Sequence, residues 1–146
     1  MSRLVYTVLI TLLARSLTVA ALIQATTYSD VQLVRVVDGD TVRLDLRVAP
    51  DLWYKNVSCR LLRIDAPEMR TAGGAEARRG LIQFLQGKKL AATVKGKDRF
   101  GRFLIELFVQ EPPVASPSAP LRAGAPGSDA INVSDWLVRS GFAVVR

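Results

Sequence analysis

Three short segments of the chain contain carboxylates, and the last two combine them with arginines: DGDT at 38–41, RLLRIDAPE at 60–68 and DRFGR at 98–102. The chain has no histidine and one cysteine. This excludes histidine-based triads, histidine zinc ligands and cysteine-rich metal sites. Catalysis would have to use carboxylates, arginines, lysines, hydroxyl groups or a bound hard metal ion. Carboxylates bind Ca²⁺ through oxygen, and arginines fork onto phosphate oxygens, so phosphate ester chemistry lies within reach of these residue types.

The first of these segments also has an ordinary structural interpretation. Asp38 and Gly39 stand between two runs that alternate apolar and polar residues, and Asp-Gly in that setting is a strong signal for a β-hairpin turn. Glycine adopts positive φ angles freely, and aspartate bonds nearby backbone amides. Taken alone, this segment is therefore best explained as a plain turn.

The other charged residues have structural alternatives as well. Asp65, which precedes Ala-Pro, could only cap the end of a strand, and Glu68 could be a solvated acid in a loop. Arg60 could pair with a structural acid such as Asp45. Arg102 could be a surface charge on a hairpin. Each of these interpretations is simpler than catalysis when its residue is taken alone.

The elements that must position these residues are mainly strands. Apolar and polar residues alternate with a period of two, which is typical of half-buried antiparallel strands. The predicted strands are residues 31–38, 40–48, 57–68, 89–96 and 101–109. Residues 49–56, which contain Pro50 and Trp53, are predicted to form a hairpin loop.

Two helices are predicted among the strands. Residues 75–89 carry an apolar stripe at three-and-four spacing, with Glu76 near the start and a lysine pair at 88–89, as the helix dipole favours. Gly87 is predicted to end this helix. A shorter helix follows Ser134, its predicted N-cap, and stops at Gly141.

This order of elements predicts a mainly β fold with helices. Five short strands, with one helix between the third and fourth and another after the fifth, fit a Greek-key barrel of the OB type. Residues 110–130 are rich in Pro, Ala, Ser and Gly and are predicted to be a flexible insertion in a domain that spans residues 29–146. The basic excess, +7 overall, favours polyanionic partners such as nucleic acid or an anionic membrane.

The first 25 residues differ from the rest of the chain. Arg3 precedes an apolar run, Arg15 interrupts it, and small residues follow. This pattern predicts a secretory signal peptide or an uncleaved signal-anchor over residues 1–25, with residues 4–23 as a membrane tether. A helix of the domain itself is the alternative. The protein is expected to be secreted or periplasmic, or anchored in a membrane and facing outside the cytoplasm.

The three charged segments, followed by SDWLVRSGFA at 134–143, resemble the staphylococcal nuclease (thermonuclease) family in both content and order. The resemblance covers about residues 31–146 and implies an OB-type five-stranded barrel with helices. It also implies a Ca²⁺-dependent phosphodiesterase that hydrolyses DNA and RNA with little sequence preference. The products would carry a 3′-phosphate and a 5′-hydroxyl, and the protein is expected to be a monomer.

The resemblance assigns roles residue by residue. Asp40 and Asp65 match the family's Ca²⁺-binding carboxylates, and Ala66 stands where a backbone carbonyl also binds the ion. Thr41 follows Asp40 as in the family, and the resemblance implies that it supports the ligand shell of the ion. The three residues that match the family's catalytic positions are Glu68, as general base or water-positioning carboxylate, and Arg60 and Arg102, as ligands of the scissile phosphate.

Several departures from the family pattern keep other functions open. The segment from Glu68 to Glu76 is short, and a tyrosine pair and a terminal helix of the family have no match after residue 143. Arg99 and Phe100 stand where the family commonly has lysine and tyrosine. The alternatives are a non-catalytic OB-type module that binds nucleic acid or protein, and an inactive truncated remnant of the nuclease.

Overall fold

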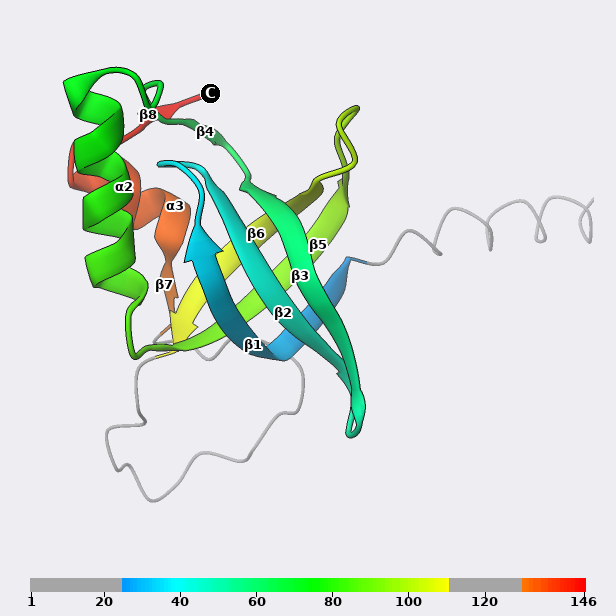
Figure 1. Ribbon diagram of the computed structural model, residues 1–146. Helices are drawn as coiled ribbons and strands as arrows, with labels where there is room; N and C mark the ends of the chain where they lie inside the picture. The colour runs from blue at the N-terminus through cyan, green and yellow to red at the C-terminus, as the bar shows by residue number, and fades with distance from the viewer. Residues whose placement is uncertain (1–24, 111–129) are drawn as a thin grey trace, which may run out of the picture.

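The computed structural model describes residues 25–110 and 130–146, and these residues form a β-barrel flanked by two helices (Figure 1). The strands and helices, in chain order, are β1 (Thr26–Val36), β2 (Thr41–Ala49), β3 (Leu52–Leu61), β4 (Ile64–Asp65), α2 (Ala72–Leu85), β5 (Lys89–Lys97), β6 (Phe103–Gln110), β7 (Ile131–Asn132), α3 (Val133–Arg139) and β8 (Val144–Val145). The predicted signal peptide or anchor, the tether at residues 4–23 and nearly all of the predicted insertion lie outside the described residues.

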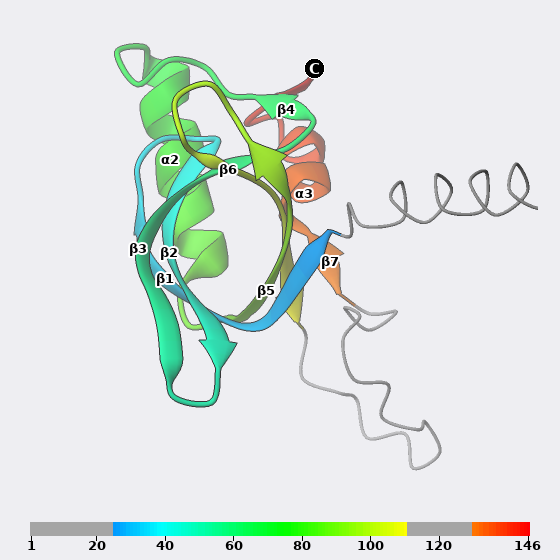
Figure 2. The ribbon, with the colours of Figure 1, turned by 90° about the vertical axis from the view of Figure 1, so that its right-hand side faces the viewer.

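Five strands close into a barrel, which Figure 2 shows as a ring of strands. The strand order is β3-β2-β1-β5-β6, with antiparallel neighbours throughout. Parallel pairing of β3 with β6, in the register Cys59 to Phe103 and Leu61 to Ile105, joins the two ends. This connectivity confirms the predicted five-stranded OB-type barrel with two helices.

In β2 and β6, alternate residues fill the barrel interior, as period-two patterning requires. Val42, Leu44 and Leu46 of β2 have at most 2% of their surface exposed, and Ile105 and Leu107 of β6 have none. Helix α2 covers one end of this core with Leu81 and its neighbours. The side chains that point outward are therefore free to be polar or charged.

The predicted loop at 49–56 and the predicted bounds of the third strand are wrong. The loop expected at 49–56 is a two-residue turn at Pro50 and Asp51, and β3 already begins at Leu52. The strand expected over 57–68 stops at Leu61, because Arg63 has a φ of 66° that breaks the pleat before β4. Asp65 is thus carried on a separate short strand.

Helix α2 begins three residues earlier than predicted and ends four residues earlier, at Ala72 and Leu85. The Thr71 side chain caps it by accepting a hydrogen bond from the Gly74 amide at 3.1 Å. The helix has no acid in its first turn and no base in its last, so the predicted dipole pairing with Glu76 is wrong. Gly87, with a φ of 71°, ends the segment as predicted.

Helix α3 begins at Val133, and its N-cap is Asn132 rather than the predicted Ser134. The Asn132 side chain accepts hydrogen bonds from the Ser134 and Asp135 amides at 2.9 and 3.3 Å. Ser134 is instead buried, and its hydroxyl donates to the Leu62 carbonyl at 2.9 Å. The predicted stop at Gly141, which has a φ of 75°, is confirmed.

The described residues contain no helix that is both long and apolar enough to cross a membrane.

Gly39 serves close packing rather than a positive φ, because its φ is not among the positive values of the described glycines. A Cβ at this position would lie 2.6 Å from the Ala66 Cβ and 3.0 Å from the Ala77 Cβ. We expect Gly39→Ala to lower the free energy of unfolding by about 1–3 kcal/mol through overpacking. Gly96→Ala, where a Cβ meets nothing within 4 Å, is the matched control for denaturant unfolding. Equal stability of the two variants would contradict the packing role.

Cys59 is fully buried on β3, and burial raises the pKa of its thiol to about 12. The folded pKa lies above the ordinary value of 9.0, so the stability that the neutral thiol contributes is complete below that value. It is lost as pH rises toward the folded pKa, because only the unfolded thiol ionises in this window.

We expect alkylation of Cys59 at pH 8 to be slow in the native protein and fast in guanidinium. The thiolate fraction falls about 1,000-fold for a pKa increase of roughly three units, and access is restricted as well. The measurement is the rate of iodoacetamide labelling followed by mass spectrometry. Equal labelling rates in native and denatured protein would show that the β3–β6 seam opens freely.

Candidate active site

A cleft of about 250 Å³ lies at the end of the barrel where the β1–β2 turn, the end of β3 and β4 meet. Figure 1 shows these segments together beneath the loop that leads into α2. The charged residues that line the cleft are Asp38, Asp40, Arg60, Asp65 and Glu68. Four carboxylates and one guanidinium therefore face one small volume, so the lining carries an excess of negative charge.

The β1–β2 turn holds Asp40 in place through its backbone. The Asp38 carboxylate accepts a hydrogen bond from the Asp40 amide at 3.1 Å, which is the turn role expected for Asp38. The Asp40 carbonyl accepts from the Leu61 amide on β3 at 2.8 Å. The turn is thus bonded on both sides, and Asp40 is fixed next to the end of β3.

The Asp40 carboxylate is almost fully buried, with 7% of the residue exposed. Its Oδ1 accepts hydrogen bonds from the Thr41 hydroxyl at 3.0 Å and from Arg60 at 3.1 Å, and its Oδ2 accepts from the Ala66 amide at 3.1 Å. Burial raises the pKa of Asp40; the Ala66 amide and the Arg60 charge oppose this, while Asp38 adds to it. A cation beside Asp40 would offset the cost of burying its charge.

Arg60 bridges Asp40 and Asp65, the two carboxylates that the family resemblance predicts to bind Ca²⁺. Its Nη1 donates to Asp40 and its Nη2 donates to Asp65. The alternative pairing of Arg60 with Asp45 is wrong, because Asp45 bonds Lys55 at 2.8 Å. Both ion pairs of Arg60 therefore lie within the cleft.

Glu68 reaches the cleft from the loop between β4 and α2. Its carbonyl accepts hydrogen bonds from the Thr71 amide at 2.9 Å and the Thr71 hydroxyl at 2.7 Å, so the start of α2 fixes this loop. Gly74 permits the approach, because a Cβ there would lie 2.0 Å from the Glu68 carbonyl oxygen. The side chain itself lies on the exposed rim, where a water molecule can reach it.

Arg102 does not line the cleft directly but is connected to it. Its Nη1 donates to the Thr41 hydroxyl at 3.4 Å, and Thr41 in turn donates to Asp40. The chain of contacts from Arg102 through Thr41 and Asp40 to Arg60 joins β6, β2 and β3. Five of the six predicted site residues thus line one cleft: Asp40, Arg60, Asp65, Ala66 and Glu68. The sixth, Arg102, is linked to the cleft through the Thr41 hydroxyl.

Asp98 is a residue to which sequence reasoning gave no role, and it holds Arg102. It accepts from the Arg102 Nε at 2.7 Å and from the Arg102 and Phe100 amides at 3.0 and 2.9 Å. Some desolvation raises the pKa of Asp98, but these hydrogen bonds outweigh it and lower the pKa overall. The DRFGR spacing contained the signal, since a carboxylate and an arginine joined by a tight turn face each other.

Arg146 is a second residue without an assigned role that reaches the site. Its amide donates to the Arg63 carbonyl at 2.9 Å, and its Nε lies 3.7 Å from Asp65 Oδ2. Pairing of β8 with β4, Val144 to Asp65, produces this approach. No local pattern could predict it, because the two residues are far apart in the sequence.

The cleft offers the kind of ligand that Ca²⁺ takes. Asp40 and Asp65 contribute hard carboxylate oxygens, Ala66 also lines the cleft, and the lining has surplus negative charge, which suits a Ca²⁺ ion. Among residues 25–110 and 130–146, no group of three or more His, Cys, Asp or Glu side chains is arranged to hold a metal ion. An ion held by two carboxylates and a carbonyl would complete its shell with water and phosphate oxygens.

Comparisons with known proteins agree with this picture. The family model for staphylococcal nuclease homologues matches residues 58–146. An uncharacterised endonuclease of Escherichia coli O157:H7 is 32% identical over 115 residues, which is 78% of this chain and 59% of the relative. Protein ParB of Escherichia coli is 33% identical over 94 residues, covering 64% of this chain and 50% of the relative.

A third relative is a micrococcal nuclease of Shigella flexneri, 30% identical over 112 residues, which is 77% of this chain and 55% of the relative. The chain thus spans between 50% and 59% of the length of these three curated relatives. The family match begins on β3, within the barrel, and includes every predicted site residue except Asp40. The chain belongs to the family of staphylococcal nuclease homologues.

Proposed function

We propose that this protein is a nuclease: a Ca²⁺-dependent phosphodiesterase that hydrolyses DNA and RNA with little sequence preference. The observation that carries the proposal is the arrangement of Arg60 between Asp40 and Asp65 in a cleft that Glu68 also lines. A purely structural cluster would balance its charges, whereas this one leaves carboxylates in excess beside a free opening.

Ca²⁺ would be held by Asp40, Asp65 and the Ala66 carbonyl. When bound, the ion supplies positive charge that neutralises a phosphate oxygen. Glu68 on the rim accepts a proton from the attacking water or orients it toward phosphorus. Its exposed position suits this role, because the carboxylate meets both solvent and the cleft.

Arg60 and Arg102 stabilise the charge that develops on the phosphate oxygens. Each guanidinium has five N–H donors, and the described contacts leave donors free on both: Arg60 uses Nη1 and Nη2, and Arg102 uses Nε and Nη1. Arginine does not give up its proton in proteins, so both residues act as fixed charges. The proton for the leaving oxygen then comes from water.

Low sequence preference follows from the kind of contact that the site offers. Arginines and a metal ion bind the phosphate group, which carries no base information. Attack on phosphorus with loss of the 5′-oxygen leaves a 3′-phosphate and a 5′-hydroxyl. DNA and RNA share this diester, so both serve as substrates.

The test is cleavage of end-labelled single-stranded DNA and RNA by the full chain in Ca²⁺ and in chelator, with the product ends identified by mass spectrometry. We expect cleavage only with Ca²⁺ and 3′-phosphate ends. Binding of DNA without cleavage in any divalent ion would favour the non-catalytic module. Failure to unfold cooperatively with Ca²⁺ and nucleotide present would favour the inactive remnant.

We infer from the likeness to the nuclease family that the domain acts as a monomer. We also infer from residues 1–25 that the protein is exported or membrane-anchored, facing outside the cytoplasm. The supporting observation is the basic start, apolar run and small residues of that segment. Cell fractionation, with mass spectrometry of the mature N-terminus, tests the export. Light scattering of the purified protein tests whether it is a monomer.

A further inference from the structure

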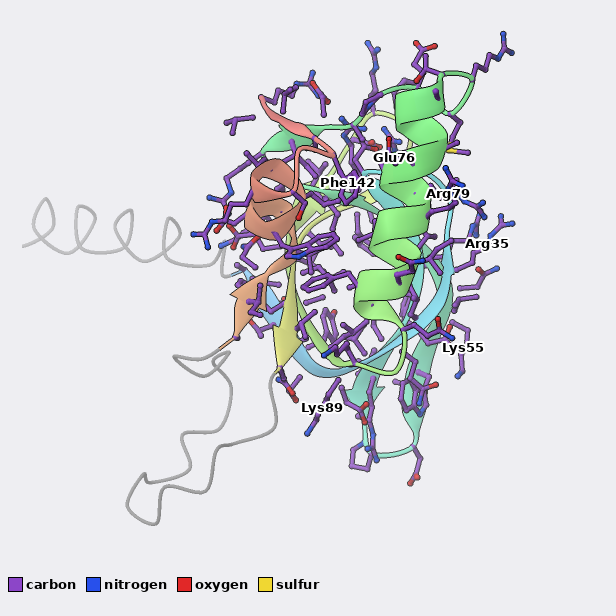
Figure 3. The ribbon with its side chains drawn as sticks, turned by 90° about the vertical axis from the view of Figure 1, so that its left-hand side faces the viewer. Arg35, Lys55, Glu76, Arg79, Lys89 and Phe142 are labelled. Carbon is purple, nitrogen blue, oxygen red and sulfur yellow. The ribbon has the colours of Figure 1, made fainter. Side chains whose placement is uncertain are left out.

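A group of arginines lies outside the cleft, where β1, β2 and α2 adjoin. Its members, named here the outer arginine cluster, are Arg35, Arg43, Arg78 and Arg79. Arg35 and Arg43 are direct cross-strand partners on β1 and β2. The Arg78 Nε donates to the Val36 carbonyl at 3.2 Å, so Arg78 of α2 lies beside β1. Figure 3 shows Arg35 and Arg79 on one side of α2, with Phe142 on the other.

The charges of the outer arginine cluster are unbalanced. Within the described residues, none of its four members forms an ion pair. The carboxylate on the same face of β2, Asp45, is already bonded to Lys55 and to the Asn56 amide, and those bonds lower its pKa. Like charges directly opposite each other on neighbouring strands destabilise a sheet. The repulsion between these arginines therefore destabilises the folded protein, and no ion pair among the described residues offsets it.

The donors of the cluster are partly fixed in place and partly unused. The Arg43 Nη1 donates to the Asn56 carbonyl at 3.1 Å, while its buried Nε has no partner. Arg78 uses its Nε on the backbone, which leaves both terminal nitrogens to a ligand. Guanidinium groups held by backbone carbonyls lose less freedom on binding an anion, and their forked donors match phosphate oxygens.

The cluster also stands next to the cleft. Val36, which binds Arg78, lies two residues before Asp38 of the cleft lining. Arg35 precedes Asp38 by three residues, or about 10 Å along a strand. At 3.4 Å per nucleotide along one strand of B-form DNA, that distance corresponds to about three nucleotides.

We propose that the outer arginine cluster binds the phosphate backbone of the nucleic acid strand that leaves the cleft over the β1–β2 turn. This rests on the proposed function and extends it: the cluster gives affinity for long strands, away from the bond that is cut. Contacts of this kind carry no base information and are strongly salt-dependent.

The experiment measures binding apart from cleavage. The full chain is titrated, in chelator, into labelled oligothymidylate of about 20 nucleotides, longer than the roughly 4–16 nucleotides that one OB fold covers. Arg35→Gln and Arg78→Gln are compared with Arg139→Gln, which removes an exposed arginine from α3 on the far side of α2. We expect each cluster variant to weaken binding about threefold to tenfold and to lower the slope of log K against log salt by about 0.7.

Thermal melting separates binding from a structural role. Arg35→Gln removes a like-charge pair, so its melting temperature should equal or exceed that of the wild type. Wild-type affinity and salt slope in both cluster variants would overturn the proposal, and so would an equal loss in Arg139→Gln. A wild type that binds in chelator but does not cut in Ca²⁺, with weakened variants, would support the cluster and reject the nuclease. A wild type that neither binds nor cuts would reject both.

Discussion

Glu68→Gln is expected to reduce the rate of phosphodiester cleavage by about 10²- to 10⁴-fold, the usual contribution of a positioned general base. Glutamine keeps the size and polarity of the side chain but cannot accept a proton from water. The backbone carbonyl that binds Thr71 is untouched, so the loop and the start of α2 should remain as they are. The measurement is the initial rate on labelled single-stranded DNA at saturating Ca²⁺.

The matched control is Glu76→Gln, which makes the same change at an exposed position on α2 outside the cleft lining. It should cleave at the wild-type rate. Strand affinity, measured without turnover, should be retained in both variants, because Glu68 is an acid that adds nothing to phosphate binding. A Glu68→Gln protein that cuts as fast as Glu76→Gln would mean that another group activates the water.

The part of the fold that could be predicted from sequence is the part with strong periodicity. The barrel followed from the number of predicted strands and the places of the two helices among them, and alternation was clearest in β2 and β6. The start of α2 was not predictable in this way, because Gly73 and Gly74 are poor helix formers. Gly74 is required by a tertiary contact, the close approach of the Glu68 carbonyl, and such contacts leave no periodic trace.

The candidate site shows the same division between local and non-local information. Asp38 in the turn follows from local chemistry, and its bond to the Asp40 amide is present. The position of Arg60 between two acids follows only from β2–β3 register and the break at Arg63. The Arg146 approach to Asp65 depends on β8 pairing with β4, which joins residues that no sequence pattern connects.

The cap of α3 shows why a plausible residue can be the wrong one. Ser134 is a good N-cap by type, but its hydroxyl is needed at the Leu62 carbonyl, beside the break between β3 and β4. Asn132 caps the helix instead. A sequence pattern gives the candidates for a hydrogen bond, and packing decides which of them is used.

Arg102→Lys is expected to lower the cleavage rate by about 10²- to 10³-fold, similar to the loss of one preorganised donor to a developing charge. Lysine keeps the positive charge but loses the planar fork, so it cannot bond Asp98 and present further donors to a phosphate together. Arg102 is held by Asp98 at 2.7 Å with 26% of its side chain exposed, which fixes its direction. Initial rates and Michaelis constants on a defined oligonucleotide measure the effect.

Asp98→Asn tests whether this positioning matters. The variant keeps Arg102 but replaces the charged acceptor of its Nε with a neutral amide. The cleavage rate should therefore fall less than in Arg102→Lys, and strand affinity should change little. Arg139→Lys, on the exposed face of α3, is the control for the arginine-to-lysine change and should be neutral. Near-wild-type turnover in Arg102→Lys would show that Arg60 alone stabilises the phosphate charge. Arg102 would then be a structural partner of Asp98, and its contact with Thr41 would serve only to close the β5–β6 hairpin onto β2.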